Sequence, residues 1–90
     1  MRILNARLVG KQTNGAVYCG RPSVYGNPFY MKDESMRDEV CDKYKAWIYS
    51  EKQTWLRERM KTELAGKDLI CWCSPKRCHC ETIREIVEGA

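Results

Sequence analysis

The residues of this chain best suited to chemistry gather near its carboxyl end. The segment 71–80 reads Cys-Trp-Cys-Ser-Pro-Lys-Arg-Cys-His-Cys and holds four of the six cysteines and the only histidine. Thiolates and imidazole rings are nucleophiles, proton carriers and preferred zinc ligands. An apolar run over residues 69–73 precedes the segment, and a helical pattern over residues 82–88 follows it. Because α/β proteins build ligand sites where a strand ends and a helix begins, we expect the functional site here.

One interpretation of this segment is a zinc site. Four of its side chains would supply a complete tetrahedral ligand set: Cys73, Cys78, His79 and Cys80. The spacing is unlike that of structural zinc sites, which pair two short Cys-x2-4-Cys turns across a longer stretch. Cys78 and Cys80 would also point apart if both were helical. We therefore hold zinc as the alternative and not as the leading interpretation.

A second interpretation is a reactive thiol. Cys78 would lie near a helix N-terminus beside Lys76 and Arg77, and both surroundings lower the pKa of a thiol. Cys73 would be its partner or a second nucleophile, and His79 would act as general acid or base.

A third interpretation is structural, since cysteine is often buried as a small hydrophobe. We favour it for three of the six cysteines: Cys19, Cys41 and Cys71.

A loop rich in glycine and proline is the second candidate for function. Residues 20–29 read Gly-Arg-Pro-Ser-Val-Tyr-Gly-Asn-Pro-Phe. The candidate ligand-binding residues are Gly20, Arg21, Ser23, Gly26 and Asn27. The glycines permit positive φ or close backbone approach, the arginine binds a phosphate or carboxylate, and the polar side chains donate and accept hydrogen bonds. The equally weighted alternative is an ordered connection in which Asn27 ties down its own turn.

Hydrophobic periodicity predicts the elements that position these two segments. Residues 2–9 and 16–19 read as strands, and Asn14-Gly15 between them is a hairpin signal. Ser35 is the expected N-cap of a helix with one apolar stripe: Met36, Val40, Tyr44, Trp47 and Ile48. A second helix over residues 53–65 turns three side chains inward: Leu56, Met60 and Leu64. Residues 69–73 read as a central, covered strand. The order β-β-α-α-β-α predicts an α/β fold, with a short sheet and helices packed on it.

Composition places the chain among small soluble domains. Its 90 residues are 43% hydrophobic and 31% charged, which predicts one domain over residues 1–90. The net charge of +4 permits contact with a nucleotide or nucleic acid without requiring it. No apolar run is long enough to cross a bilayer, and the first residues lack a secretory pattern. We therefore expect a cytoplasmic protein whose cysteines are thiols.

Both motifs together resemble those of a known family. Residues 17–29 resemble the Gly-Arg-Pro-Ser…Gly-Asn-Pro-Phe signature of an uncharacterised bacterial and phage family catalogued as domain of unknown function 4326. Residues 71–79 resemble its Cys-Trp-Cys-x-Pro-x-x-Cys-His signature, and Asp42 to Trp47 resembles its Tyr-x-x-Trp helix. The resemblance singles out Gly20, Arg21, Asn27, Cys73, Cys78 and His79. It gives no support to Cys80, where a small residue is more usual, and Arg77 stands where proline is common.

These observations predict one site where the loop 20–29 meets the turn 73–79. The leading hypothesis is a phage-encoded domain that binds or modifies a nucleotide or nucleic-acid component. In it Arg21 and the loop hold an anion, with Cys73, Cys78 and His79 at the reacting centre. The alternative is a non-catalytic, zinc-stabilised module that binds a host protein or nucleic acid. Whether the protein is an enzyme stays open, and the sequence predicts no oligomeric state.

Overall fold

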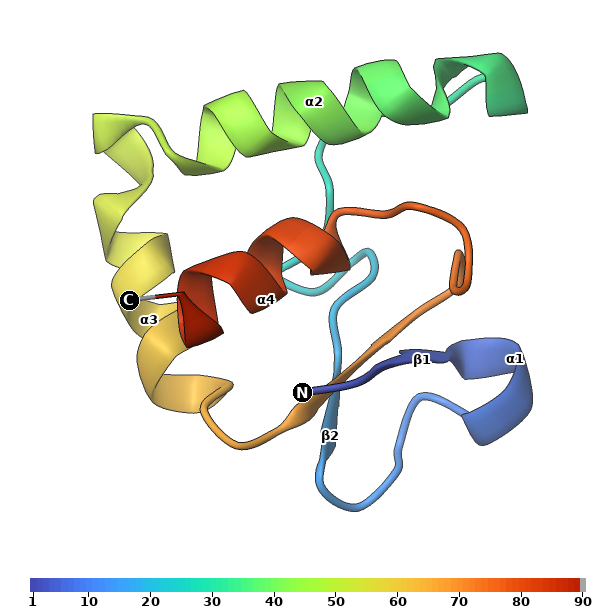
Figure 1. The fold of residues 1–90 in the computed structure, drawn as a ribbon, viewed down its shortest axis with the longest axis vertical. Coiled ribbons are helices and arrows are strands. Elements are labelled where there is room, and N and C mark those ends of the chain that lie inside the picture. Colours follow the sequence, from blue (N-terminus) through green and yellow to red (C-terminus); the bar gives the residue numbers. More distant parts are fainter. Residues whose placement is uncertain (90) are drawn as a thin grey trace.

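A three-stranded parallel sheet organises the protein. The computed structural model describes residues 1–89. Strands β1 (Ile3–Asn5), β2 (Ala16–Tyr18) and β3 (Asp68–Cys71) lie in the order β1-β3-β2, as Figure 1 shows. Ile3 pairs with Leu69 on one side of β3, and Val17 pairs with the same residue on the other. The predicted α/β fold class is confirmed, and the predicted central strand is present and covered. It ends at Cys71, however, so Trp72 and Cys73, expected in the strand, lie beyond it, and Trp72 is exposed.

The predicted hairpin is wrong. β1 and β2 do not pair with each other, because they lie on opposite sides of β3. Each runs parallel to β3, and so they run parallel to one another, whereas a hairpin joins antiparallel strands. The strand expected over residues 2–9 ends at Asn5, whose side chain caps the short helix α1 (Ala6–Val9) by accepting from the Arg7 amide at 2.8 Å. Gly15, at φ +80°, brings the chain back to the sheet, where its carbonyl accepts from the Asp68 amide at 2.9 Å.

The predicted start of the first long helix needs a small correction. A 3-10 turn, η1 (Glu34–Met36), leads into α2 (Arg37–Ile48). Asp33 is the cap, and its carboxylate accepts from the Ser35 amide at 2.9 Å, so Ser35 is not the N-cap. A carboxylate satisfies a first-turn amide as well as a hydroxyl does, and the helical segment begins at Glu34, two residues earlier than an N-cap at Ser35 would place it. The predicted stripe is correct at its centre, where Val40, Tyr44 and Ile48 are buried.

The remaining helices follow the predicted pattern. A second 3-10 turn, η2 (Glu51–Gln53), leads into α3 (Thr54–Glu63). The three predicted inward residues of this region are fully buried: Leu56, Met60 and Leu64. Gly66 then takes φ +74°, the left-handed conformation that ends many helices. The last helix, α4 (Cys80–Glu88), begins two residues before the expected start.

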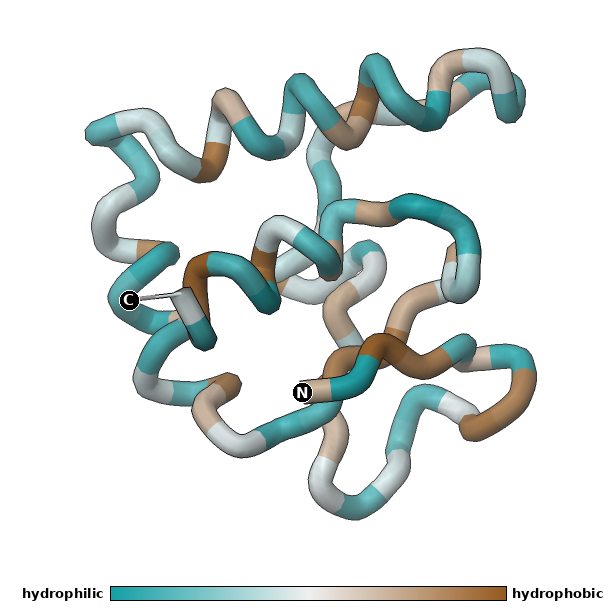
Figure 2. Tube along the Cα trace, viewed as in Figure 1, coloured by the Kyte–Doolittle hydropathy of each residue, from teal (hydrophilic) through white to brown (hydrophobic). Residues whose placement is uncertain are grey.

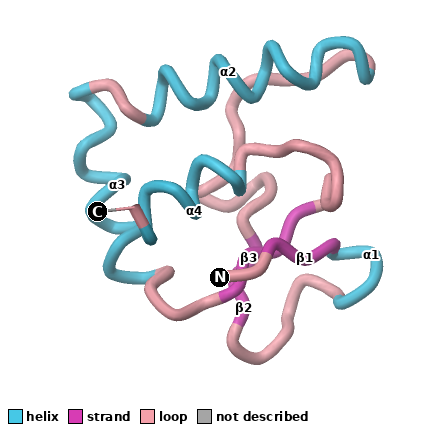
Figure 3. Tube along the Cα trace, in the orientation of Figure 1, coloured by secondary structure: helices cyan, strands magenta, loops and turns pink. Residues whose placement is uncertain are grey.

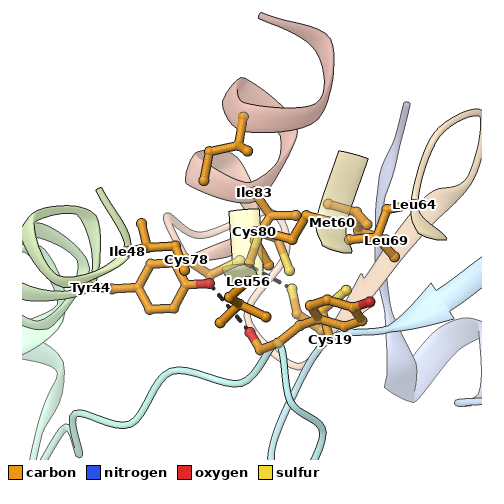
Figure 4. Close-up of a cluster of buried hydrophobic side chains, with 13 residues drawn as sticks. Cys19, Tyr44, Ile48, Leu56, Met60, Leu64, Leu69, Cys78, Cys80 and Ile83 are labelled. Atoms are coloured by element: carbon orange, nitrogen blue, oxygen red, sulfur yellow. Dashed lines mark hydrogen bonds between the residues drawn. The ribbon is translucent and has the colours of Figure 1, made fainter. Parts of the chain in front are cut away.

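The helices enclose a core that reaches the cysteine segment. In Figure 1, α2 spans the top, α3 descends from its end, and α4 lies between them and the sheet. Figure 2 shows hydrophobic residues concentrated on the strands and on parts of α4. Among the buried side chains of Figure 4, Cys78 and Cys80 lie beside apolar residues from α2 and α3. Two of these neighbours are Tyr44 and Leu56.

The two candidate segments lie in the longest connections. Figure 3 shows loops leaving the ends of β2 and β3, and these loops carry residues 19–33 and 72–79. β2 and β3 are neighbouring parallel strands, so the loops start from the same edge of the sheet. Among the described residues, no helix has the length and apolarity needed to cross a membrane.

Candidate functional site

A cavity of about 360 Å³ lies where the two loops meet. The glycine-proline loop contributes Gly20, Arg21, Asn27 and Phe29. The cysteine segment contributes Cys71, Trp72, Cys73, Cys78 and His79. The wall is completed by Tyr18, Met31, Arg37, Val40 and Cys41. The structure thus brings most of the predicted site residues to one cavity at the end of the sheet, where ligand sites in such sheets form.

Two of the predicted ligand-binding residues shape the loop and do not line the cavity. Ser23 accepts from the Tyr25 amide at 3.1 Å through its hydroxyl, and its own amide donates to the Gly20 carbonyl at 2.9 Å. Gly26 lies against Arg21: a Cβ placed there would come within 3.1 Å of the Arg21 nitrogen. Gly26 therefore serves by close approach and not by positive φ, and it lets the loop fold back under Arg21.

Asn27 fixes the loop to helix α2. Its side-chain oxygen accepts from the Phe29 amide at 2.8 Å, and its amide group donates to the Val40 carbonyl at 3.3 Å. The alternative role weighed for Asn27, tying down its own turn, is therefore present in the structure alongside its place on the cavity wall. An Asx turn of this kind stabilises the loop through its own backbone, so the loop needs no bound ligand to become ordered.

A chain of polar contacts joins the two motifs at the mouth of the cavity. The Trp72 indole donates to the Tyr18 hydroxyl at 2.9 Å, and that hydroxyl donates to the Arg21 carbonyl at 3.0 Å. The ammonium of Lys11 lies 4.8 Å from the centre of the Tyr18 ring, and the Arg21 guanidinium lies 4.0 Å from that of Tyr30. Each of these cations therefore lies against an aromatic ring.

The turn that carries Cys73 is anchored to β1. Asn5 donates from its side-chain amide to the Ser74 carbonyl at 2.7 Å, and the Ser74 hydroxyl donates to the Ile3 carbonyl at 3.1 Å. The Ser74–Pro75 peptide bond is cis, as is Arg21–Pro22 in the other loop. Sequence reasoning missed Asn5, because its role depends on β1 lying beside β3.

Three thiols form a compact cluster at the inner end of the cavity. The Sγ atoms of Cys71, Cys78 and Cys80 lie within 4.8 Å of one another, and all three residues are buried. The Cys71 and Cys78 sulfurs are 3.3 Å apart. Cys78 and Cys80 do not diverge as expected, because α4 begins only at Cys80 and Cys78 lies in the preceding turn. This cluster could hold a metal ion.

The cluster differs from the four ligands predicted from the sequence. Cys78 and Cys80 belong to both sets. The predicted ligands Cys73 and His79 are not part of the cluster, whereas Cys71, which was not predicted as a ligand, is. Cys71 was interpreted as packing alone, since its strand looked like simple core. Cys73, which is half-buried, lies on the cavity wall beside Cys78 and the Arg37 guanidinium. Its position leaves it the most exposed thiol of the segment.

The pKa of Cys78 shifts in the direction opposite to the one expected. Hydrogen bonds from Cys78 and from Arg37 lower the pKa of Cys73 to about 6. Contacts with Cys78 and Cys80 also lower the pKa of Cys71. The pKa of Cys78 is raised, because its thiol donates to Cys71 and Cys73 and because it is buried. Hydrogen bonds between the thiols and burial therefore outweigh the helix N-terminus and the nearby cations, which we expected to lower the pKa of Cys78. The role of Cys78 as a reacting thiol stays a prediction.

Arg37 is a second residue that sequence reasoning missed. Its guanidinium donates to both carboxylate oxygens of Glu34, at 2.9 and 2.7 Å, and to the Arg77 carbonyl at 2.9 Å. It also forms a hydrogen bond with the Cys73 thiol. A cation in the first turn of a helix opposes the helix dipole. That unfavourable placement is the sequence signal that could have marked Arg37 as working in a site.

His79 holds the two loops together. Its Nε2 lies 2.7 Å from the Cys19 carbonyl, so this nitrogen carries the proton and donates. The ring packs edge-on against Tyr44 at 5.1 Å between centres. Burial lowers the pKa of His79, which keeps the imidazole neutral. Its predicted role in proton transfer stays a prediction, and any such role would fall to Nδ1.

Comparison with known proteins places the chain in a family. A family model described as "Domain of unknown function (DUF4326)" matches residues 5–89. The chain belongs to this family. The match confirms the resemblance and spans both cavity-forming segments of this DUF4326 domain. Neither the curated proteins nor the solved structures include a significant match. Because the family description names no activity, the function must be argued from the site.

Proposed function

We propose that the DUF4326 cavity binds a nucleotide or a nucleotide-sized component of a nucleic acid. The observation that carries the proposal is that one cavity is walled by Arg21, Arg37 and three aromatic side chains. These aromatic residues are Tyr18, Phe29 and Trp72. A volume of about 360 Å³ falls in the range of small-molecule sites and suits a base with its attached sugar or phosphate.

Charge favours an anionic ligand. Among the described residues that line the cavity, two are arginines and none is acidic. Arg37 shares its charge with Glu34 outside the cavity, whereas Arg21 has only the Tyr30 ring beside it among its cation contacts. Arginine presents several donors in one plane, which matches a phosphate. We therefore assign Arg21 to the phosphate and the aromatic wall to the base.

The reacting group of a modifying activity would be Cys73. Of the three residues predicted for this centre, it is the one that combines partial exposure with a place on the cavity wall. The Arg37 guanidinium beside it stabilises the thiolate, which is the nucleophilic form. Cys78 and His79 also line the cavity but are buried, and they position the turn. Binding is the primary proposal, and reaction at Cys73 is its extension.

Fluorescence titration with nucleoside monophosphates, nucleosides and short single-stranded oligonucleotides tests the proposal, using Trp72 at the cavity wall as the reporter. Arg21→Ala should weaken monophosphate binding about 10- to 100-fold, as expected for the loss of a charge-assisted hydrogen bond. Arg7→Ala, an exposed arginine away from the cavity, is the matched control. Saturable binding that Arg21→Ala leaves unchanged would contradict the phosphate assignment, and no binding by any of these compounds would contradict the proposal.

A second candidate function is a zinc-stabilised module that binds a partner without catalysis. The specific observation in its favour is the buried cluster of Cys71, Cys78 and Cys80. Thiolates are soft ligands that zinc accepts readily. Removing zinc from such a module should lower its thermal stability while alkylation of Cys73 leaves partner binding intact. Loss of nucleotide binding on alkylation of Cys73 would instead favour the primary proposal.

A further inference from the structure

The three-thiol cluster stands at the point where the core meets the cavity. Cys71 ends the central strand, Cys80 begins α4, and Cys78 lies in the turn before it. Cys71 and Cys78 are also part of the cavity wall, whereas Cys80 is fully buried behind them. One side of the sulfur triangle therefore faces the cavity, and the other faces packed core.

The spacing of the sulfurs suits a single metal ion. With zinc–sulfur bonds of about 2.3 Å, tetrahedral geometry places neighbouring sulfurs about 3.8 Å apart. The three Sγ atoms lie within 4.8 Å of one another, with the shortest separation 3.3 Å. Small side-chain rotations are enough to turn the triangle into one face of a tetrahedron. Two of the ligands come from regular elements, since Cys71 ends the central strand β3 and Cys80 begins α4, which packs against it.

We propose that Cys71, Cys78 and Cys80 bind one zinc ion through three thiolates and leave a fourth coordination position open to the cavity. Binding releases the three thiol protons to solvent, and the metal offsets the buried negative charge. Three protein ligands with one open position is the arrangement of zinc sites that act on a ligand, whereas purely structural sites close all four positions.

Cys73 remains outside this ligand set. It projects into the cavity wall next to Cys78, and its sulfur has Arg37 as its cationic partner. The fourth position therefore takes water, which an aromatic ring nitrogen of the bound ligand displaces. This assignment of the ligand's donor atom rests on the proposed nucleotide function, but the metal site itself does not.

Cobalt(II) provides the test, because its absorption reports both thiolate ligation and coordination geometry. Protein stripped with a chelator should take up one cobalt(II) or one zinc per chain, measured by native mass spectrometry. Cobalt loading should give intense sulfur-to-metal charge-transfer bands. Cys80→Ser should lose metal binding, while Cys73→Ser and the matched control Cys41→Ser should retain it. Metal uptake by the unaltered protein is measured alongside, so the test does not depend on every variant folding.

The open position is tested by adding imidazole, a ring-nitrogen donor, to the cobalt protein. A saturable change in the cobalt d–d bands is expected, and spectra that imidazole leaves unchanged would overturn the open position. If Cys73→Ser lost metal binding to the same degree as Cys80→Ser, the site would have four thiolate ligands. That result would also overturn the open position. Failure of the wild-type protein to bind either metal overturns the site altogether.

The two proposals fail in distinguishable ways. Nucleotide binding by metal-free protein with no metal uptake would leave the proposed function standing and overturn the metal site. Stoichiometric cobalt uptake with an imidazole response, but no nucleotide binding, would support the metal site and overturn the nucleotide assignment. Both titrations use the same protein, so the results can be compared directly.

Discussion

Replacing His79 with phenylalanine separates a positioning role from proton transfer. The Nε2 hydrogen bond to the Cys19 carbonyl, 2.7 Å long, links the start of α4 to the end of β2. Phenylalanine keeps an aromatic ring against Tyr44, whose centre is 5.1 Å from the imidazole. It removes the donor, however, and leaves the Cys19 carbonyl without this partner in a buried site. The variant therefore isolates the hydrogen bond from the packing.

The expected cost follows from that single loss. Leaving a buried acceptor unsatisfied costs roughly 1–3 kcal/mol. For a domain of this size each kcal/mol shifts the melting temperature by about 4–8 °C. A loss of about 2 kcal/mol would therefore lower the melting temperature of His79→Phe by roughly 8–16 °C. His79→Gln keeps an amide donor near the position of Nε2 and should recover part of this loss.

Thermal and urea unfolding, followed by circular dichroism, measure the stability of both variants. Native-state alkylation of Cys73 provides a second readout, because a loosened turn should also change access to that thiol. The reasoning would be refuted if His79→Phe were as stable as the wild-type protein. It would also be refuted if His79→Gln were the less stable of the two variants, since the donor would then contribute less than the ring.

Three further predictions rest on single contacts. Arg37→Gln should cost about 1–2 kcal/mol in urea unfolding, because its hydrogen bond to the Arg77 carbonyl is lost; unchanged stability would mean that the turn is held without it. Burial and the hydrogen bond to Glu63 raise the pKa of Tyr25 to about 12. The associated stabilisation should be complete below pH 10 and be lost as the pH rises through about 12, whereas Tyr25→Phe should show a shallower decline over this range. Met60→Ala should lower the free energy of unfolding by about 2–5 kcal/mol in the same assay, since Met60 is fully buried, and a smaller loss would indicate that the core closes over the gap.

Local patterns predicted the elements well. The apolar stripe of α2 and the inward residues of α3 depend on a 3.6-residue repeat that each helix carries by itself. Leu69 and Ile70 mark the central strand because a strand covered on both faces is apolar throughout. The hairpin failed because Asn14-Gly15 specifies a turn and not a partner: β1 pairs with a strand more than sixty residues away.

The site was predicted in outline, since both motifs reach one cavity, but its internal contacts were not. Arg37 meets Cys73 only because the start of α2 packs against the turn 72–79, and no spacing in the sequence encodes that contact. The pairing of Cys71 with Cys78 likewise depends on where α4 begins. Sequence spacing showed the helix N-terminus and the cations near Cys78 but not its contacts with other sulfurs, and these contacts raise its pKa.

The buried thiols differ in their hydrogen-bond partners, and the Cys19 thiol also contacts that of Cys80. The Cys19 thiol donates to the Val17 carbonyl at 3.4 Å, and the Cys41 thiol donates weakly to the Arg77 carbonyl at 3.9 Å. A backbone carbonyl is enough to accept the weak hydrogen bond of a buried thiol that otherwise packs as a small apolar side chain, as the structural interpretation requires. Cys71 and Cys78 instead face each other. If these two side chains only filled the core, alanine or valine would pack there as well as cysteine. Sulfur atoms that converge at a cavity wall instead match the needs of a bound metal ion. Burial therefore does not argue against function at this cluster, because one ion can satisfy several buried thiolates together.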